Sequence, residues 1–251
     1  MSFLASPPPE EDRPPGPFLR PEPVRVVWAL IAVNASIFAL ETYWGGSTSS
    51  PTLYRMGAIA GRSALPSEPW RVLSSAFLHI GPAHLLVNMW ALWAFGRSLE
   101  QLMGGARLLV LYALSALGGG TLSALGHEVR LAAGASGAVW GLMVAQLVLV
   151  LRPRSLFEDL TFEVNKLTVL QPLVINLLYS LQPGIDLLGH LGGGAAGGLA
   201  MASGLLSLRP GAAGWKVAAG VAVLAMAGSI GLAFATGQPW ELAAPAPRLR
   251  P

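Results

Sequence analysis

The segment GASGAVWG at residues 134–141 contains one serine, Ser136, with Gly134, Gly137 and Gly141 around it. It lies where a short polar loop ends and an apolar helix is expected to begin, so backbone N–H groups there are free to point at a ligand. Taken alone, the pattern is more typical of a serine in a tight helix entry. Beside a histidine, however, a serine becomes a nucleophile with its general base, which is the chemistry of acyl transfer.

Three polar side chains elsewhere are candidates for such a site. His84 and Asn88 lie four residues apart near the start of one apolar segment, so they share a face of its helix. His190 lies a few residues into another apolar segment. By themselves, His84 and Asn88 are equally typical of helix-packing hydrogen bonds. In an acyl-transfer site they would donate hydrogen bonds to the oxyanion, together with the backbone N–H of Ser136.

The composition indicates an all-α polytopic membrane protein. Hydrophobic residues make up 53% of the chain, charged residues only 12%, and the mean hydropathy is +0.56, whereas a soluble domain carries about 25% charged residues. The net charge of +3 comes from arginines spread over the loops, which excludes a nucleic-acid-binding patch. The chain has no cysteine, no HExxH motif and no zinc-like histidine spacing, so no disulfide, metal or cofactor is expected.

The charged residues separate long apolar runs, which predict seven membrane spans in a domain covering residues 24–236. A proline-rich N-terminal tail (1–23) and a C-terminal tail (237–251) are predicted to be disordered. A long loop is expected at 45–81. The predicted spans are 26–44, 82–103, 107–125, 136–151, 166–182, 187–208 and 215–236.

The placement of arginines predicts the orientation of these spans. The short loops with most arginines are expected inside, which puts the N-terminus in the cytoplasm. The spans that carry His84, Ser136 and His190 then all begin at the outer surface. At ~1.5 Å rise per residue, these side chains and Asn88 fall within roughly 10 Å of the outer boundary. A bacterial inner membrane is the expected location.

Small residues predict how two of the spans meet. Gly137 and Gly141 form one small-xxx-small stripe, and Gly193 and Gly197 form another. Because such stripes let helices approach closely, the two spans are expected to touch and to bring Ser136 within hydrogen-bond reach of a histidine, His190. One turn below Ser136, Trp140 is placed to stack on that imidazole.

These residues resemble the rhomboid family of intramembrane serine proteases over roughly residues 24–236. The segments that carry the resemblance are Trp70-Arg71, HIGPAHLLVNM (79–89), Gly96 to Glu100, GASG (134–137) and GHLGGGAAGG (189–198). Their order within seven spans is specific, whereas GxSG alone is not. The resemblance implies a bundle of six core transmembrane helices plus one C-terminal helix.

The resemblance also implies roles for single residues. Ser136 would be the nucleophile and His190 the general base, with oxyanion contributions from His84, Asn88 and the Ser136 amide. The substrate would be the transmembrane segment of another protein, cut within the lipid bilayer near the outer face. Trp140 departs from the family, which commonly has tyrosine there.

Several other polar residues are expected to lie outside the catalytic set. No carboxylate completes a triad, and Asp186 is left out of the site. Glu100 and Trp70-Arg71 are interpreted as structural, and His79 as a structural hydrogen-bonding residue. On the fifth span, Pro172 weakens the helix, and together with the family resemblance this makes the span the expected side of substrate entry. Three polar residues there either line that entry or cap backbone near the proline: Gln171, Asn176 and Tyr179.

Two alternatives remain open from sequence. One is a catalytically inactive rhomboid-like protein that binds transmembrane helices. The other is a small transporter that uses the same polar cluster, although the inner halves of the relevant spans are largely apolar. The sequence specifies neither the substrate nor the oligomeric state.

Overall fold

The computed structural model describes residues 24–127, 131–151, 166–204, 206 and 214–236. The predicted tails, 1–23 and 237–251, and the predicted inner loop at 152–165 lie outside the described residues. Within them the regular structure is helical. The helices are α1 (Val26–Tyr43), α2 (Ser50–Arg55), η2 (Arg62–Ala64), α3 (Arg71–Ser74), η3 (Ser75–Phe77), α4 (Pro82–Met103), α5 (Gly105–Gly126), α6 (Ser136–Leu151), α7 (Lys166–Ser180), α8 (Leu187–Ala202) and α9 (Gly214–Thr236).

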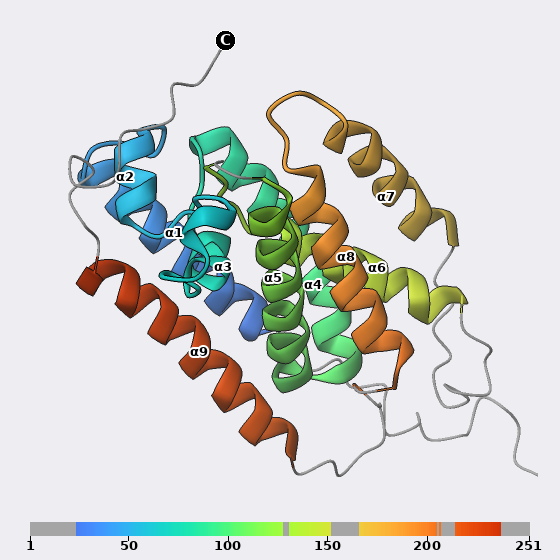
Figure 1. Ribbon diagram of the computed structural model, residues 1–251. Coiled ribbons are helices and arrows are strands. Elements are labelled where there is room, and N and C mark those ends of the chain that lie inside the picture. The colour runs from blue at the N-terminus through green and yellow to red at the C-terminus, as the bar shows by residue number, and fades with distance from the viewer. Residues whose placement is uncertain (1–23, 128–130, 152–165, 205, 207–213, 237–251) are drawn as a thin grey trace, which may run out of the picture.

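The seven predicted spans correspond to α1 and α4 to α9, which confirms the all-α fold (Figure 1). One boundary was wrong. The helix α8 ends at Ala202 rather than at residue 208, because Gly204 follows it with a φ of 74°. That left-handed conformation suits glycine and stops the helix. The predicted loop at 45–81 also contains the short helices α2, η2, α3 and η3.

The helices differ in their capacity to cross a membrane. Three helices are long and apolar enough to cross a membrane: α1, α5 and α9. The helix α4 also meets these criteria when it is taken together with the preceding Arg71–Phe77 segment, from which it is bent by 95°. The helices α6, α7 and α8 have 16, 15 and 16 residues. At ~1.5 Å per residue they reach about 24 Å, less than the ~30 Å hydrocarbon thickness. Short helices therefore carry Ser136 and His190.

Among the described elements, the helices α5, α6 and α8 pack together most extensively. A methyl group at Gly193 would come within 3.0 Å of Gly137 Cα, and one at Gly197 within 2.6 Å of Gly141 Cα. The predicted contact between the two glycine stripes is therefore confirmed. A third helix joins this contact, because a methyl group at Gly119 of α5 would lie 2.8 Å from the carbonyl oxygen of residue 189. This contribution of α5 was not predicted.

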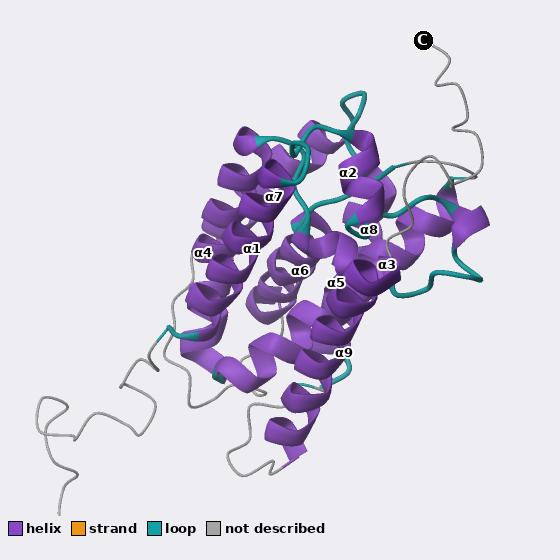
Figure 2. Ribbon diagram, turned by 90° about the vertical axis from the view of Figure 1, so that its left-hand side faces the viewer, coloured by secondary structure: helices purple, strands orange, loops and turns teal. Residues whose placement is uncertain are grey.

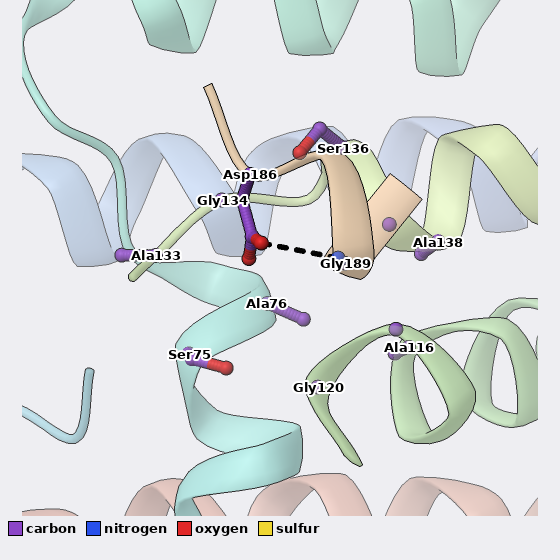
Figure 3. A pocket seen from close by; sticks show the side chains of 12 residues that line it. Ser75, Ala76, Ala116, Gly120, Ala133, Gly134, Ser136, Ala138, Asp186 and Gly189 are labelled. Carbon is purple, nitrogen blue, oxygen red and sulfur yellow. Dashed lines mark hydrogen bonds between the residues drawn. The ribbon is translucent and has the colours of Figure 1, made fainter. Parts of the chain in front are cut away.

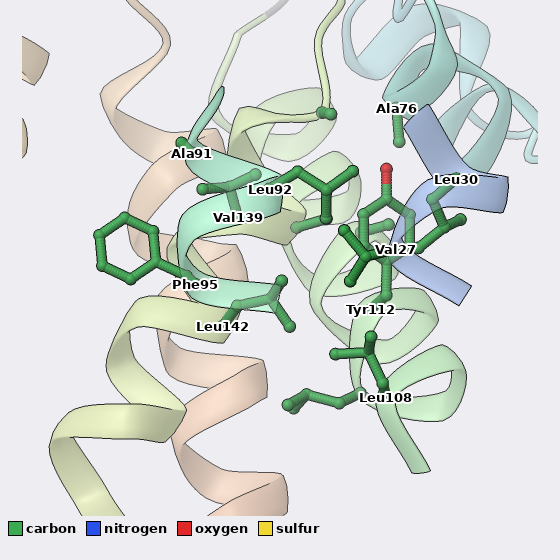
Figure 4. Close-up of a cluster of buried hydrophobic side chains, with 14 of the residues drawn as sticks. Val27, Leu30, Ala76, Ala91, Leu92, Phe95, Leu108, Tyr112, Val139 and Leu142 are labelled. Carbon is green, nitrogen blue, oxygen red and sulfur yellow. The ribbon is translucent and has the colours of Figure 1, made fainter. Parts of the chain in front are cut away.

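An apolar core holds the other helices against this group (Figure 4). Val27 of α1, Leu92 of α4 and Tyr112 of α5 are each fully buried there. A polar clamp also fixes the orientation of α4 relative to α6, because Gln146 Nε2 of α6 donates to the Phe95 carbonyl oxygen of α4, at 2.8 Å. The core and the clamp together fix α4, with His84 near its start, relative to α6, with Ser136 at its start.

Two helices lie on opposite flanks of the bundle, as Figure 1 and the turned view in Figure 2 show. The helix α9 packs against α5 and α3, and α7 packs against α6. Most side chains of α7 are exposed, and its buried residues are Val169 and Ser180. The flank formed by α7 is therefore less firmly attached than the α5–α6–α8 centre.

Buried charged groups fix the ends of the bundle. Arg71 is 3% exposed; its guanidinium donates to the Tyr54 and Ala58 carbonyl oxygens and pairs with Glu68 at 2.9 Å. At the other end, the Glu100 carboxylate accepts backbone N–H groups at the start of α1. These N–H groups lack intrahelical partners. The structural roles predicted for Arg71 and Glu100 are confirmed.

Candidate active site

A small pocket lies where α6 and α8 begin, beside η3 and α5 (Figure 3). Its volume of about 40 Å³ gives room for a few water molecules. Ser136 is partly exposed into it. The other lining residues are Ser75, Ala76, Ala116, Gly119, Gly120, Ala133, Gly134, Gly137, Ala138, Asp186 and Gly189.

The loop before α6 is held by hydrogen bonds to the 45–81 segment. Ile59 and Ala132 form an antiparallel bridge, and the Gly134 N–H donates to the Ser75 carbonyl oxygen at 2.9 Å. The helix α6 then begins at Ser136. Because the first N–H groups of a helix have no intrahelical acceptor, those of Ser136, Gly137 and Ala138 are available beside the pocket. This end of α6 is suited to bind negative charge.

Gly134 keeps open the space between two candidate groups. Its φ of +142° lies in a region that favours glycine. A Cβ at this position would lie 2.9 Å from His84 Nε2 and 3.6 Å from Ser136 Oγ. The imidazole of His84 and the hydroxyl of Ser136 therefore border the same small space.

Hydrogen bonds orient His84 within this space. The Ile80 backbone N–H donates to His84 Nδ1 at 3.2 Å. Since Nδ1 accepts, the proton of the neutral ring lies on Nε2, the atom next to Gly134. Asn88 Nδ2 donates to the His84 carbonyl oxygen at 2.9 Å and is held one turn away on the same helix face. His84 thus presents an N–H donor toward Ser136.

His190 lies on α8 between an aromatic ring and a hydroxyl group. Its ring stacks on Trp140 with centroids 5.4 Å apart and planes inclined by 16°, so the expected stacking is present. Its Nδ1 is 2.6 Å from Ser180 Oγ of α7. Within the described part of the chain no hydrogen bond joins Ser136 Oγ to His190, although such a bond was expected. The structure pairs His190 with a serine on another helix.

Other polar residues have structural partners. Asp186 lines the pocket, but its carboxylate accepts the Gly189 N–H at 3.1 Å and caps α8. The His79 backbone N–H donates to Glu41 Oε1 at 3.0 Å, whereas neither of its ring nitrogens has a hydrogen-bond partner among the described residues. Of the three polar residues on α7, Asn176 donates to the Pro172 carbonyl oxygen at 2.8 Å, which is the capping role. Tyr179 is 59% exposed.

Ser180 was missed by the sequence analysis. It follows polar residues on the span with the weakest helical pattern, and a serine in a helix usually bonds to its own backbone. Its 1% exposure on an otherwise exposed helix is visible only in three dimensions.

Comparison with known proteins identifies the family. The model of the rhomboid domain matches residues 66–208, more than half of the chain. The chain is 33% identical over 201 residues to the rhomboid protease GluP of Bacillus subtilis, covering 80% of this chain and 38% of GluP. It is 30% identical over 186 residues to the putative rhomboid protease YdcA of the same species, covering 70% of this chain and 85% of YdcA.

A plant relative extends the comparison. RHOMBOID-like protein 5 of Arabidopsis thaliana is 38% identical over 155 residues, which are 59% of this chain and 48% of that protein. The chain therefore spans less than half the length of some curated relatives that it matches. From the domain match, the relatives and the apolar helices, we conclude that the chain belongs to the rhomboid family and is a multi-pass integral membrane protein.

Proposed function

We propose that the protein is an intramembrane serine endopeptidase with Ser136 as nucleophile and His190 as general base. The observation that carries this proposal is the space at Gly134, bordered by the Ser136 hydroxyl and the N–H face of His84. A peptide carbonyl carbon in that space would meet the nucleophile on one side and hydrogen-bond donors on the other. This is the geometry that acyl transfer requires.

The reaction follows from these positions. Ser136 Oγ forms a bond to the carbonyl carbon while its proton moves to His190 Nε2. The carbon–nitrogen bond then breaks, and the same proton passes to the leaving amine. Water, activated by His190, attacks the acyl-enzyme, releases the new carboxyl group and returns the proton to Ser136. The pocket beside Ser136 has room for that water.

Three donors would stabilise the oxyanion of the intermediate. They are the Ser136 backbone N–H at the start of α6, His84 Nε2 and the Asn88 amide group. Removal of one such donor typically lowers kcat by a factor of about 10²–10³. The missing Ser136–His190 hydrogen bond is compatible with this role, because catalytic hydrogen bonds are often long before substrate binds.

The short helices support cleavage inside the membrane but close to one surface. With 16 residues each, α6 and α8 fall short of the hydrocarbon thickness, so their N-terminal ends lie below the surface where a pocket can still hold water. The arginine pattern predicts that this is the outer surface and that the N-terminus lies in the cytoplasm. A transmembrane segment that unwinds into the pocket is the substrate class. The loosely packed α7 is the side by which it enters.

The test is reconstitution of the full chain in liposomes with a panel of single-span membrane proteins. We expect wild type to cut at least one of them within its transmembrane segment, with the cut mapped by mass spectrometry. Ser136→Ala and His190→Ala should leave it intact. Binding without cleavage by wild type would favour the inactive helix-binding alternative. Solute flux into liposomes that contain the wild-type chain but no substrate protein, and not into protein-free liposomes, would favour the transporter.

A further inference from the structure

At its C-terminal end, the buried face of α7 contacts His190, the proposed general base. Val169 and Ser180, the buried residues of this helix, are three helical turns apart and therefore lie on one face. Leu173, between them on that face, packs against the apolar core. Ile175, on the opposite side, is 65% exposed. The face that docks α7 onto α6 thus places one hydroxyl group, that of Ser180, against His190.

The position of the Ser180 proton follows from two distances. Ser180 Oγ lies 2.6 Å from the Asn176 carbonyl oxygen and 2.6 Å from His190 Nδ1. Two oxygen atoms at 2.6 Å repel one another unless a hydrogen lies between them, and a carbonyl oxygen can only accept. The single hydroxyl proton of Ser180 therefore points to Asn176. In the hydrogen bond between Ser180 Oγ and His190 Nδ1, the donor must therefore be His190 Nδ1.

This hydrogen-bond chain determines which nitrogen of His190 can act as a base. With the proton on Nδ1, the neutral ring carries its lone pair on Nε2. That is the nitrogen left to accept the Ser136 proton. The opposite tautomer would place a proton on Nε2 and would disable the base.

We propose that Ser180 is the positioning residue that holds His190 in its basic tautomer, and that the reactivity of Ser136 therefore depends on the docking of α7. This inference rests on the proposed function and deepens it. Ser180 touches neither substrate nor nucleophile and acts through the imidazole. In this role a neutral hydroxyl, itself fixed by the Asn176 carbonyl, replaces the carboxylate of a catalytic triad. When α7 moves away, the bond to Nδ1 is lost, the basic tautomer is no longer favoured, and Ser136 reacts more slowly.

The first experiment measures the second-order rate of Ser136 labelling by a fluorophosphonate in the purified full chain. Ser180→Ala should label about five- to tenfold more slowly, the effect of one lost hydrogen bond. Ser180→Thr keeps the hydroxyl and should restore most of the rate. The matched control is Ser229→Ala, because Ser229 is buried in α9 and makes the same i−4 bond, to the Ala225 carbonyl oxygen at 2.6 Å, but is not bonded to a histidine.

A second readout reports the tautomer itself. The chain has four histidines, so nitrogen NMR of histidine-labelled protein gives a simple spectrum, assigned for His190 with His190→Ala. Wild type should show His190 with a protonated Nδ1 and an unprotonated Nε2. Ser180→Ala should shift both signals toward the other tautomer, a change that a merely structural role would not produce.

A double-mutant cycle tests the dependence on α7. Val169→Ala loosens the docking face and should slow labelling, whereas Ile175→Ala on the exposed face should not. If docking acts through Ser180, Val169→Ala should have no further effect in the Ser180→Ala background. Independent, additive losses would overturn the coupling between docking and the base.

The outcomes separate the two proposals. Equal labelling rates and an unchanged His190 spectrum in Ser180→Ala would overturn the role of Ser180 and leave the protease proposal standing. Wild-type protein that is folded but never labelled would overturn the proposed function, whatever tautomer His190 adopts.

Discussion

Trp140 and His190 lie nearly parallel, with ring centroids 5.4 Å apart. During the proposed reaction His190 becomes positively charged, and an indole face stabilises a cation by about 0.5–2 kcal/mol. We expect Trp140→Leu to lower kcat about tenfold, and Trp140→Tyr to retain most of the activity because it keeps an aromatic face. Steady-state cleavage in liposomes measures both.

The control for this prediction is Trp90→Leu, because Trp90 is 62% exposed on α4. It should leave kcat unchanged. Equal losses in Trp140→Leu and Trp90→Leu would show that removal of any tryptophan impairs the protein and would contradict a specific role for stacking.

A methyl group at Gly134 should block the site. Gly134→Ala would place a Cβ 2.7 Å from His84 Cε1 and between that ring and Ser136. We expect loss of both cleavage and probe labelling. The matched control is Gly46→Ala, since Gly46 also has a positive φ, of 101°, but has nothing within 4 Å of its Cβ position. If the two variants lose activity equally, backbone strain is responsible and the space at Gly134 has no special role.

The close approach of α6 and α8 should make the free energy of unfolding sensitive to a methyl group at their contact. Gly197→Ala would force a Cβ against the Gly141 backbone, and overpacking of this kind costs about 1–3 kcal/mol. Gly220→Ala on α9 has open space and should be neutral or stabilising by up to about 1 kcal/mol, because alanine favours a helix. Unfolding in mixed micelles compares the two free energies. Similar values would argue against a backbone-to-backbone contact.

Removal of the carboxylate at Glu100 should destabilise the start of α1 without changing the chemistry. Glu100 accepts the backbone N–H groups of Arg25, Val26 and Val27 at 2.8–2.9 Å. Hydrogen bonds to a charged group contribute about 1.5–3 kcal/mol, so Glu100→Gln should lower the free energy of unfolding by about 2 kcal/mol, and Glu100→Ala by more. At low temperature kcat per folded molecule should not change. A fall in kcat with unchanged stability would instead assign Glu100 to the site.

The helices and the glycine contact could be predicted because their causes are local in sequence. Apolar runs determine where α1 and α4 to α9 form, and glycines at i and i+4 mark the face where α6 meets α8. The depth argument placed His84 and Ser136 at a similar depth, and in the structure both lie beside Gly134. These inferences need only the period and the rise of a helix.

What the sequence could not predict depends on contacts between distant segments. The end of α8 was placed too late, because apolar residues continue beyond the glycine that ends the helix. The clamp from Gln146 to Phe95 and the bond from Ser180 to His190 each join residues of separate helices. Neither side chain lies in a motif, so only the packing shows its partner. The same holds for Gly119, which approaches both α6 and α8.

The most direct test of the central claim is labelling of purified, folded protein with a fluorophosphonate probe, because the probe reacts with an activated serine without any knowledge of the substrate. We predict that wild type is labelled at one site, which peptide mapping assigns to Ser136. Ser136→Ala should abolish labelling, and His190→Ala should reduce it to background. Absence of labelling in folded wild type, or equal labelling in Ser136→Ala, would contradict the account.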